Sequence, residues 1–120
     1  MVPSPAWFRT RPVGRVRRDE ALHRGNPMSI RLTVELPIKE GQAEAFIAAA
    51  GPALARVRAE DAGCEMYDLF RSVDDDTRFV MIESWASEAD LEAHKTSPAM
   101  GEVGKAIGGF MAGAPVIHQY

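Results

Sequence analysis

Residues 78–94, RFVMIESWASEADLEAH, decide the fold of this chain, because a strand pattern changes into a helix pattern within this one stretch. In its first half, every second side chain from Phe79 to Trp85 falls on the same face. A two-residue period of this kind is typical of a β-strand. The face that ends in Trp85 also carries Met81 and the carboxylate of Glu83, so a polar group shares an otherwise apolar surface.

The second half of the stretch predicts a short helix. Ser87 occupies an N-cap position, and Asp90 follows three residues later, as in a capping box. Leu91 and His94 are three residues apart, so they share one face of that helix. The stretch therefore brings the indole of Trp85, an imidazole and a carboxylate toward one region, which is the clearest functional signal in the sequence.

The residues around this stretch complete a βαββαβ order of elements. Residues 30–36 alternate as a first strand, and apolar residues at helical spacing follow over 42–60, where Gly51 and Pro52 predict a kink or break. The chain continues as strand 64–71, turn 72–77, strand 78–85, helices 87–95 and 98–110, and strand 115–120. This order matches the ferredoxin-like motif, so we expect an α+β domain with a four-stranded antiparallel sheet.

The sheet of such a domain has a second face that the helices do not cover. The strand at 78–85 is apolar there too, with Val80 and Ile82, and the strand before it is apolar on both faces, with Met66 and Phe70 on one and Tyr67 and Leu69 on the other. An exposed apolar surface of this size marks an interaction site. The simplest partner is a second copy packed sheet on sheet, so the sequence predicts a homodimer.

Composition narrows the class of protein. The chain has 120 residues, which suits one domain, and no window reaches the roughly 18 consecutive apolar residues of a membrane span. A single cysteine fits a reducing, cytoplasmic compartment. Residues 28–120 hold eight Lys or Arg against fifteen Asp or Glu, a net charge of −7, so nucleic acid is not an expected partner.

Residues 1–27 differ from the rest. They hold six Arg against two acidic residues, a net charge of +4, together with four prolines and no sustained periodicity. Such a segment cannot bury much apolar surface, so we expect it to be disordered and the folded domain to span 28–120. A start codon placed too far upstream of Met28, an Arg-rich targeting segment and a basic tail that binds an acidic surface all stay open.

No motif in the chain predicts a metal or a bound cofactor. Asp74, Asp75 and Asp76 lack the alternating ligands and distal glutamate of a calcium loop, so they read as a solvated hairpin turn. Cys64 has no cationic neighbours in sequence and is expected to be a buried thiol.

Two segments resemble a known family. RAEDAGCEMYDLFRS, which contains Gly63, Cys64 and Tyr67, and RFVMIESWASEADLEAHKTSP resemble the antibiotic biosynthesis monooxygenase domain, most closely its quinol monooxygenase subgroup. The resemblance covers about residues 29–120 and is carried by Glu-x-Trp with a histidine nine residues later. It implies a dimeric α+β barrel, with a pocket between sheet and helices in each protomer.

Family members differ in chemistry, so the resemblance implies several functions. Some oxidise phenolic or quinol substrates with dioxygen and need no metal or flavin, and we take a small aromatic quinol or phenol as the first hypothesis. Others degrade haem, but those carry an asparagine on the first strand, which residues 30–36 lack. A third possibility is a non-redox isomerase or a ligand-binding module.

Three residues are predicted to be catalytic, and each also has a purely structural interpretation. His94 is either a satisfied, partly buried histidine or the base that removes a phenolic proton, a role that the family's helix histidine supports. Trp85 is a core residue, a pocket wall whose indole N–H orients a substrate oxygen, or both. Tyr67 either packs on the sheet or donates a hydrogen bond into the pocket.

Five further residues are predicted to contact substrate. Glu83 is either a structural ion pair or a pocket group, and its burial would raise its pKa unless a partner holds the charge. The other four have an ordinary core interpretation as well as a place in the cavity wall, and they are Phe46, Met81, Met100 and Phe110.

Overall fold

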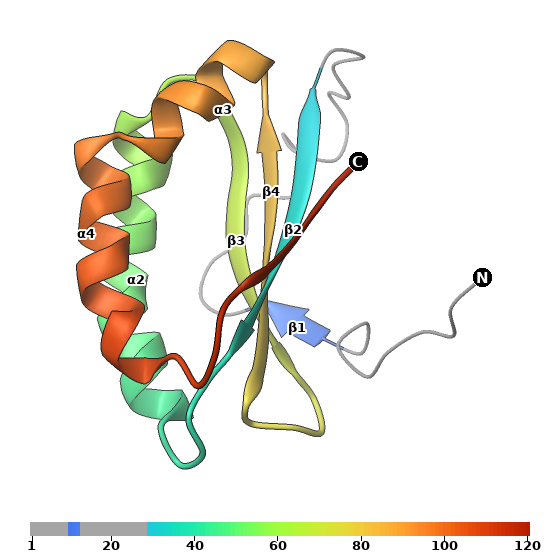
Figure 1. Ribbon diagram of the computed structural model, residues 1–120, viewed down its shortest axis with the longest axis vertical. Helices are drawn as coiled ribbons and strands as arrows, with labels where there is room; N and C mark the ends of the chain where they lie inside the picture. Colours follow the sequence, from blue (N-terminus) through green and yellow to red (C-terminus); the bar gives the residue numbers. More distant parts are fainter. Residues whose placement is uncertain (1–9, 13–28) are drawn as a thin grey trace.

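The computed structural model of the protein describes residues 10–12 and 29–120. Three long strands form the centre of the fold, and the helices cover one face of these strands (Figure 1). The strands are β1 (Thr10–Pro12), β2 (Ile30–Pro37), β3 (Cys64–Ser72), β4 (Arg78–Trp85) and β5 (Val116–Gln119). The helices are α2 (Ala43–Glu60), α3 (Glu88–Lys95) and α4 (Pro98–Ile107), followed by a 3₁₀ turn, η2 (Gly108–Phe110). None of the described helices is long and apolar enough to cross a membrane.

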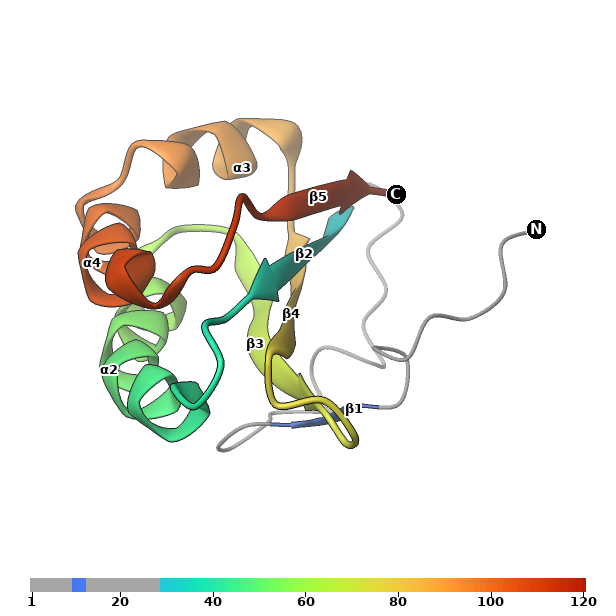
Figure 2. The same ribbon diagram turned by 60° about the horizontal axis from the view of Figure 1, so that its bottom comes forward.

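The strands form one antiparallel sheet in the order β1-β3-β4-β2-β5 (Figure 2). Without β1, the remaining four strands have the order of the predicted ferredoxin-like motif, which is confirmed. Helices α2 and α4 lie side by side over one face, and α3 lies at the end where β4 finishes (Figures 1 and 2). The connections therefore put the end of β4 and the helix after it directly beside the space between the two layers.

The alternation predicted for β4 is confirmed. Phe79, Met81, Glu83 and Trp85 are all buried on the face that meets the helices. Opposite them, Phe46 of α2 is fully buried and packs edge-on against Phe79, with ring centroids 4.8 Å apart. Burial of large aromatic side chains supplies most of the free energy that holds such layers together.

Helix α2 runs through Pro52 without interruption from Ala43 to Glu60, so the predicted break does not occur. A proline inside a helix removes one N–H and leaves the carbonyl four residues earlier, that of Ala48, without its usual donor. Ala48, Gly51 and Pro52 are all exposed, so water can hydrate that carbonyl and the helix tolerates the defect.

The helix ends follow their sequence signals. Ser87 caps α3 by accepting from Asp90 N at 3.1 Å, and its hydroxyl donates to the Asp90 carboxylate at 2.9 Å. Pro98 opens α4 behind the cap Ser97, which accepts from Met100 N. These caps satisfy donors that the first turn of any helix leaves unpaired.

The N-terminal segment contributes one unpredicted element. Thr10–Pro12 form β1, which pairs with β3 at Phe70 to Ser72. The rest of residues 1–27 lies outside the described residues, so its predicted disorder and its possible origins stay predictions.

Two glycines with the same φ angle provide a test of the packing between Gly63 and the first turn of α3. Gly41 and Gly63 both have φ of +77°, but an added Cβ would meet nothing at Gly41 and would collide with the Asp90 side chain at Gly63. We expect Gly41→Ala to lower the free energy of unfolding by about 1–2 kcal/mol through backbone strain alone. Gly63→Ala should cost at least about 1 kcal/mol more because of overpacking. Urea denaturation measures both, and equal losses would show that the Asp90 contact is unimportant.

Candidate functional site

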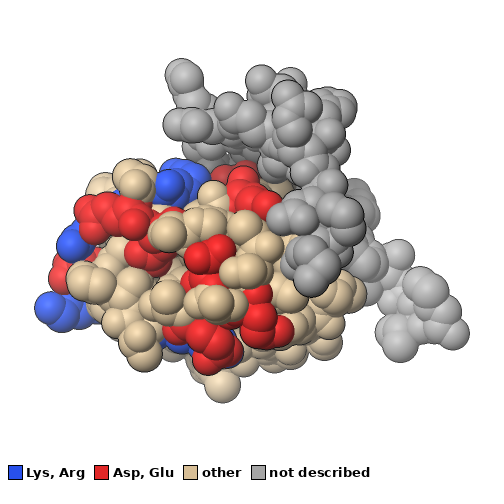
Figure 3. Space-filling model, turned by 90° about the horizontal axis from the view of Figure 1, so that it is seen from above, with Lys and Arg blue, Asp and Glu red and all other residues tan. Residues whose placement is uncertain are grey.

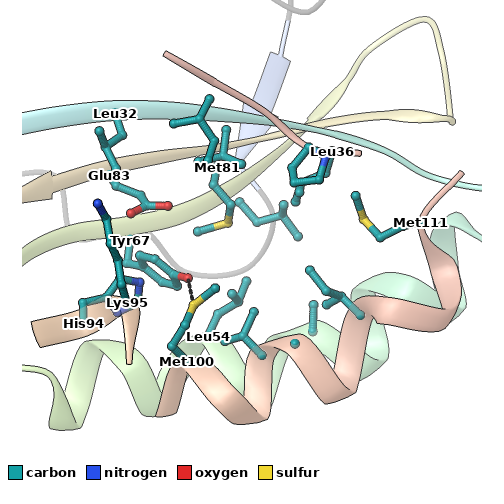
Figure 4. Close-up of a pocket in the computed structure, with 18 of the residues that line it drawn as sticks. Leu32, Leu36, Leu54, Tyr67, Met81, Glu83, His94, Lys95, Met100 and Met111 are labelled. Carbon is teal, nitrogen blue, oxygen red and sulfur yellow. Dashed lines mark hydrogen bonds between the residues drawn. The ribbon is translucent and has the colours of Figure 1, made fainter. Parts of the chain in front are cut away.

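A cavity of about 400 Å³ lies between the sheet and helices α2 and α4 (Figure 4). Most of its wall is apolar, formed by side chains such as Leu36, Phe46, Leu69 and Val103. Five polar side chains also reach it, namely Tyr67, Glu83, His94, Lys95 and Gln119. A concave apolar site with a few convergent polar groups is the usual form of a small-molecule site.

His94 is held in the cavity wall by a buried carboxylate. Its Nδ1 lies 2.7 Å from Oδ2 of Asp61, and the two side chains are only 5% and 7% exposed. Asp61 directly follows α2, and its Oδ2 also accepts from the hydroxyl of Ser97 at 2.8 Å. The histidine on α3 is therefore tied both to the end of α2 and to the cap of α4.

The hydrogen bond to Asp61 sets the tautomer of His94. A carboxylate can only accept, so Nδ1 carries the proton and Nε2 of the neutral ring keeps its lone pair. Nε2 has no hydrogen-bond partner among the described residues. Because the ring lines the cavity, this nitrogen is the one that can take a proton from a ligand.

Aromatic rings fix the plane of the imidazole. Trp85 stacks on His94 with ring centroids 4.3 Å apart and planes inclined by 29°. Tyr67 meets the imidazole edge-on, at 5.2 Å between centroids. With Asp61 holding one edge, His94 is restrained by three neighbours and presents Nε2 in one direction.

Trp85 has the core position that was one of its two predicted roles. The side chain is fully buried and is not part of the cavity wall. Its Nε1 donates to Oε1 of Glu83 at 3.0 Å, so the indole N–H is already satisfied. Trp85 instead supports two residues that do line the cavity, His94 by stacking and Glu83 by a hydrogen bond.

Glu83 and Tyr67 are buried polar groups, and the pKa of each is raised. Desolvation raises the pKa of Glu83, although the hydrogen bond from Trp85 opposes this, as does His94 whenever its ring is protonated. Desolvation, and next the charge of Glu83, raise the pKa of Tyr67. Tyr67 is therefore a phenol at neutral pH and acts as a hydrogen-bond donor, never as a base.

The Tyr67 hydroxyl is available to a ligand. Its contact in the structure is the sulfur of Met100 at 3.7 Å, drawn as a dashed line in Figure 4. A thioether is a weak acceptor, so an oxygen of a bound molecule would replace it readily.

Four of the five residues predicted to contact substrate do line the cavity, namely Phe46, Met81, Glu83 and Met100. Phe110 does not, because it packs on the ring of Phe46 at 6.1 Å between centroids. Burial raises the pKa of Cys64 to about 12, so its thiol is inert at neutral pH, although the residue is half-buried and not fully buried as predicted.

Asp61 is the functional residue that sequence reasoning missed. It lies 33 residues before His94, and its position after a helix is typical of an ordinary cap. The local periodicity of the sequence does not indicate that the Asp61 side chain points at the end of α3 and at the cap of α4. The one feature of the sequence that could have pointed to Asp61 is its position two residues before Gly63 and Cys64, where β3 begins.

The raised pKa of Glu83 predicts how stability depends on pH. Below about pH 4 the carboxyl is protonated in both states, and as pH rises the unfolded chain loses the proton first, so the free energy of unfolding falls. Glu83→Gln keeps an acceptor for Trp85 but removes the ionisation. We expect the variant to gain stability relative to wild type between about pH 4 and about pH 7 in urea denaturation. Exposed Glu40→Gln should gain nothing, and a flat difference for Glu83→Gln would contradict the assigned burial cost.

Comparison with known proteins gives a consistent result. The family model of the antibiotic biosynthesis monooxygenases matches residues 29–106. The chain is similar to a Bacillus subtilis (strain 168) protein named "Putative monooxygenase YcnE", with 35% identity over 77 residues, which are 63% of this chain and 80% of that protein.

Solved structures show the same likeness. A "putative antibiotic biosynthesis monooxygenase" from Caulobacter crescentus CB15 has a TM-score of 0.71 at 30% identity, covering 77% of this chain and 87% of that one. One from Nitrosomonas europaea has a TM-score of 0.71 at 25% identity, covering 78% and 88%. The matched residues include Tyr67, Glu83 and His94. The chain therefore belongs to the antibiotic biosynthesis monooxygenase family.

Proposed function

We propose that this protein is a cofactor-independent monooxygenase that oxidises a small aromatic quinol or phenol with dioxygen. The observation that carries the proposal is the buried Asp61–His94 pair at the wall of a largely apolar cavity. Family membership supports monooxygenase activity in general, and the choice of an aromatic substrate rests on the resemblance to the quinol monooxygenase subgroup, with which the apolar cavity is compatible.

The first step is removal of a hydroxyl proton. Nε2 of His94 takes the proton, and the Asp61 carboxylate stabilises the imidazolium that forms. The Tyr67 hydroxyl donates a hydrogen bond to the developing phenolate oxygen, because its own proton is held firmly. A phenolate transfers an electron to dioxygen far more readily than the neutral phenol does.

The oxidation needs no external reductant. After electron transfer, superoxide and the aryl radical combine to form a carbon–oxygen bond, and a proton completes a ring hydroperoxide. Cleavage of its O–O bond, with loss of the ring C–H proton, leaves a carbonyl and releases water. For a benzene quinol, C₆H₆O₂ and O₂ give the hydroxyquinone C₆H₄O₃ and H₂O, and the quinol supplies all four electrons.

The apolar wall serves this chemistry in two ways. It excludes water that would compete for the phenolate, and it offers a favourable environment to dioxygen, an apolar gas. The surface beside α3 carries many acidic side chains, including Glu88, Asp90 and Glu92 (Figure 3). This field disfavours polyanionic ligands and fits a neutral aromatic substrate.

We also propose that the protein works as a homodimer. Ile117 of β5 lines the cavity and yet is 62% exposed, and β5 is exposed along its whole length. On the far face of the sheet, Met66, Phe70 and Ile82 are only half-buried. A second copy would cover these apolar groups and close the wall at β5.

Sedimentation equilibrium tests the homodimer directly. We expect a species of twice the 13.1 kDa chain mass at micromolar concentration. A stable single subunit under those conditions would contradict the proposal.

The same residues favour one non-redox alternative. His94 as a base and Tyr67 as a firmly protonated hydrogen-bond donor line the same cavity, and such a pair could also serve a small isomerase. Such a reaction would proceed equally well without dioxygen, whereas the proposed oxidation stops.

Oxygen consumption with a panel of quinols and phenols, in protein freed of metals by chelation, tests the oxidation. We expect His94→Gln to lower kcat by about 10²–10⁴-fold through loss of the base. Asp61→Asn should lower kcat by at least about tenfold, because an amide can hold the other tautomer of His94. Lys105→Gln is the control, because Lys105 is exposed on α4, does not line the cavity and should keep wild-type activity.

Two outcomes would contradict the proposed function. One is the absence of oxygen uptake on every substrate by folded wild-type protein. The other is full activity of folded His94→Gln, which would show that the imidazole is not the base.

A further inference from the structure

The polar groups of the cavity lie at one end of it. Figure 4 shows Tyr67, Glu83, His94 and Lys95 together at one end, with Leu36 and Met111 at the other. The distribution is uneven enough to restrict how a ligand can lie.

The register of the sheet is the cause of this uneven distribution. Tyr67 pairs with Glu83, Glu83 with Leu32, and Leu32 with Gln119, so these side chains form one row across four strands. The next row toward Met111, about 7 Å along the strands, contains only apolar side chains, namely Leu69, Met81, Val34 and Ile117.

The helices also contribute polar side chains at one end of the cavity and apolar side chains at the other. His94 and Lys95 come from the last turn of α3, beside the polar row. Farther along the cavity, α4 contributes Val103 and Ile107, and Met111 follows η2. Phe46 closes the apolar end from α2.

We infer that the cavity binds an amphiphilic aromatic molecule in a single orientation. The oxygens of this molecule lie on one edge, against His94 and the row of side chains that contains Tyr67 and Glu83. The rest of the molecule carries no oxygen and extends toward Met111. This deepens the proposed function and rests on it for the identity of the reacting edge. An oxygen at the far end would lose its water and find no partner among Leu36, Phe46 and Met111.

Anaerobic titration calorimetry with three probes tests the orientation. 1-Naphthol has one oxygenated edge and an apolar body, phenol lacks the body, and 1,5-dihydroxynaphthalene adds a hydroxyl at the far ring. We expect 1-naphthol to bind about tenfold tighter than phenol, because the second ring buries apolar surface. 1,5-Dihydroxynaphthalene should bind about tenfold to a hundredfold weaker than 1-naphthol.

A designed partner at the far end provides the matched test. Met111→Gln keeps the side-chain length and supplies an amide there, so it should tighten 1,5-dihydroxynaphthalene relative to 1-naphthol by about tenfold. Lys105→Gln introduces the same amide at an exposed position of α4, outside the cavity, and should leave the ratio unchanged.

The outcomes separate this inference from the proposed function. Equal affinity of the two naphthols for wild type, no binding of any probe, or an unchanged ratio in folded Met111→Gln would overturn the inference. Selective binding of 1-naphthol without oxygen uptake on any substrate would instead overturn the oxidation and leave the orientation intact.

Discussion

One carboxylate oxygen, Oδ2 of Asp61, connects the three helices of this fold. It lies at the end of α2, accepts from His94 of α3, and accepts from Ser97, which caps α4. Buried charges are costly unless they are hydrogen-bonded, so Asp61 and its two donors are stable only as a set. Because α3 and α4 are joined through Ser97, this set also determines where the cavity wall ends and which way His94 faces.

The cavity reflects a conflict between packing and polarity on one sheet face. Strand alternation puts Glu83 on the same side as Phe79, Met81 and Trp85, where a carboxylate has no solvent. The indole N–H of Trp85 offsets part of the cost of burying the Glu83 carboxylate by donating to its Oε1. Glu83 also lines the cavity, so it is not packed on every side. A fully packed core would fill this space with side chains, so the retained polar row at Tyr67 and Glu83 is consistent with selection for binding over stability.

The sequence predicted those features that depend on local periodicity and capping. The strand of residues 78–85, the cap at Ser87 and the proximity of Trp85 to His94 all follow from spacing within one stretch, and the structure has them. The features it did not predict depend on contacts between distant segments. Asp61 meets His94 across 33 residues, and Pro52 stays helical because its neighbours face solvent. Trp85 and Phe110 belong to the cluster of predicted site residues but do not line the cavity, and spacing in the sequence could not separate these two positions.

The tautomer of His94 is the most direct test of this account, and ¹⁵N-resolved NMR of the imidazole measures it. We predict a neutral ring protonated at Nδ1 with a bare Nε2, and loss of that preference in Asp61→Asn. A neutral ring protonated at Nε2 in the folded wild-type protein would contradict the account, because the nitrogen that does not contact Asp61 would then carry no lone pair to accept a substrate proton.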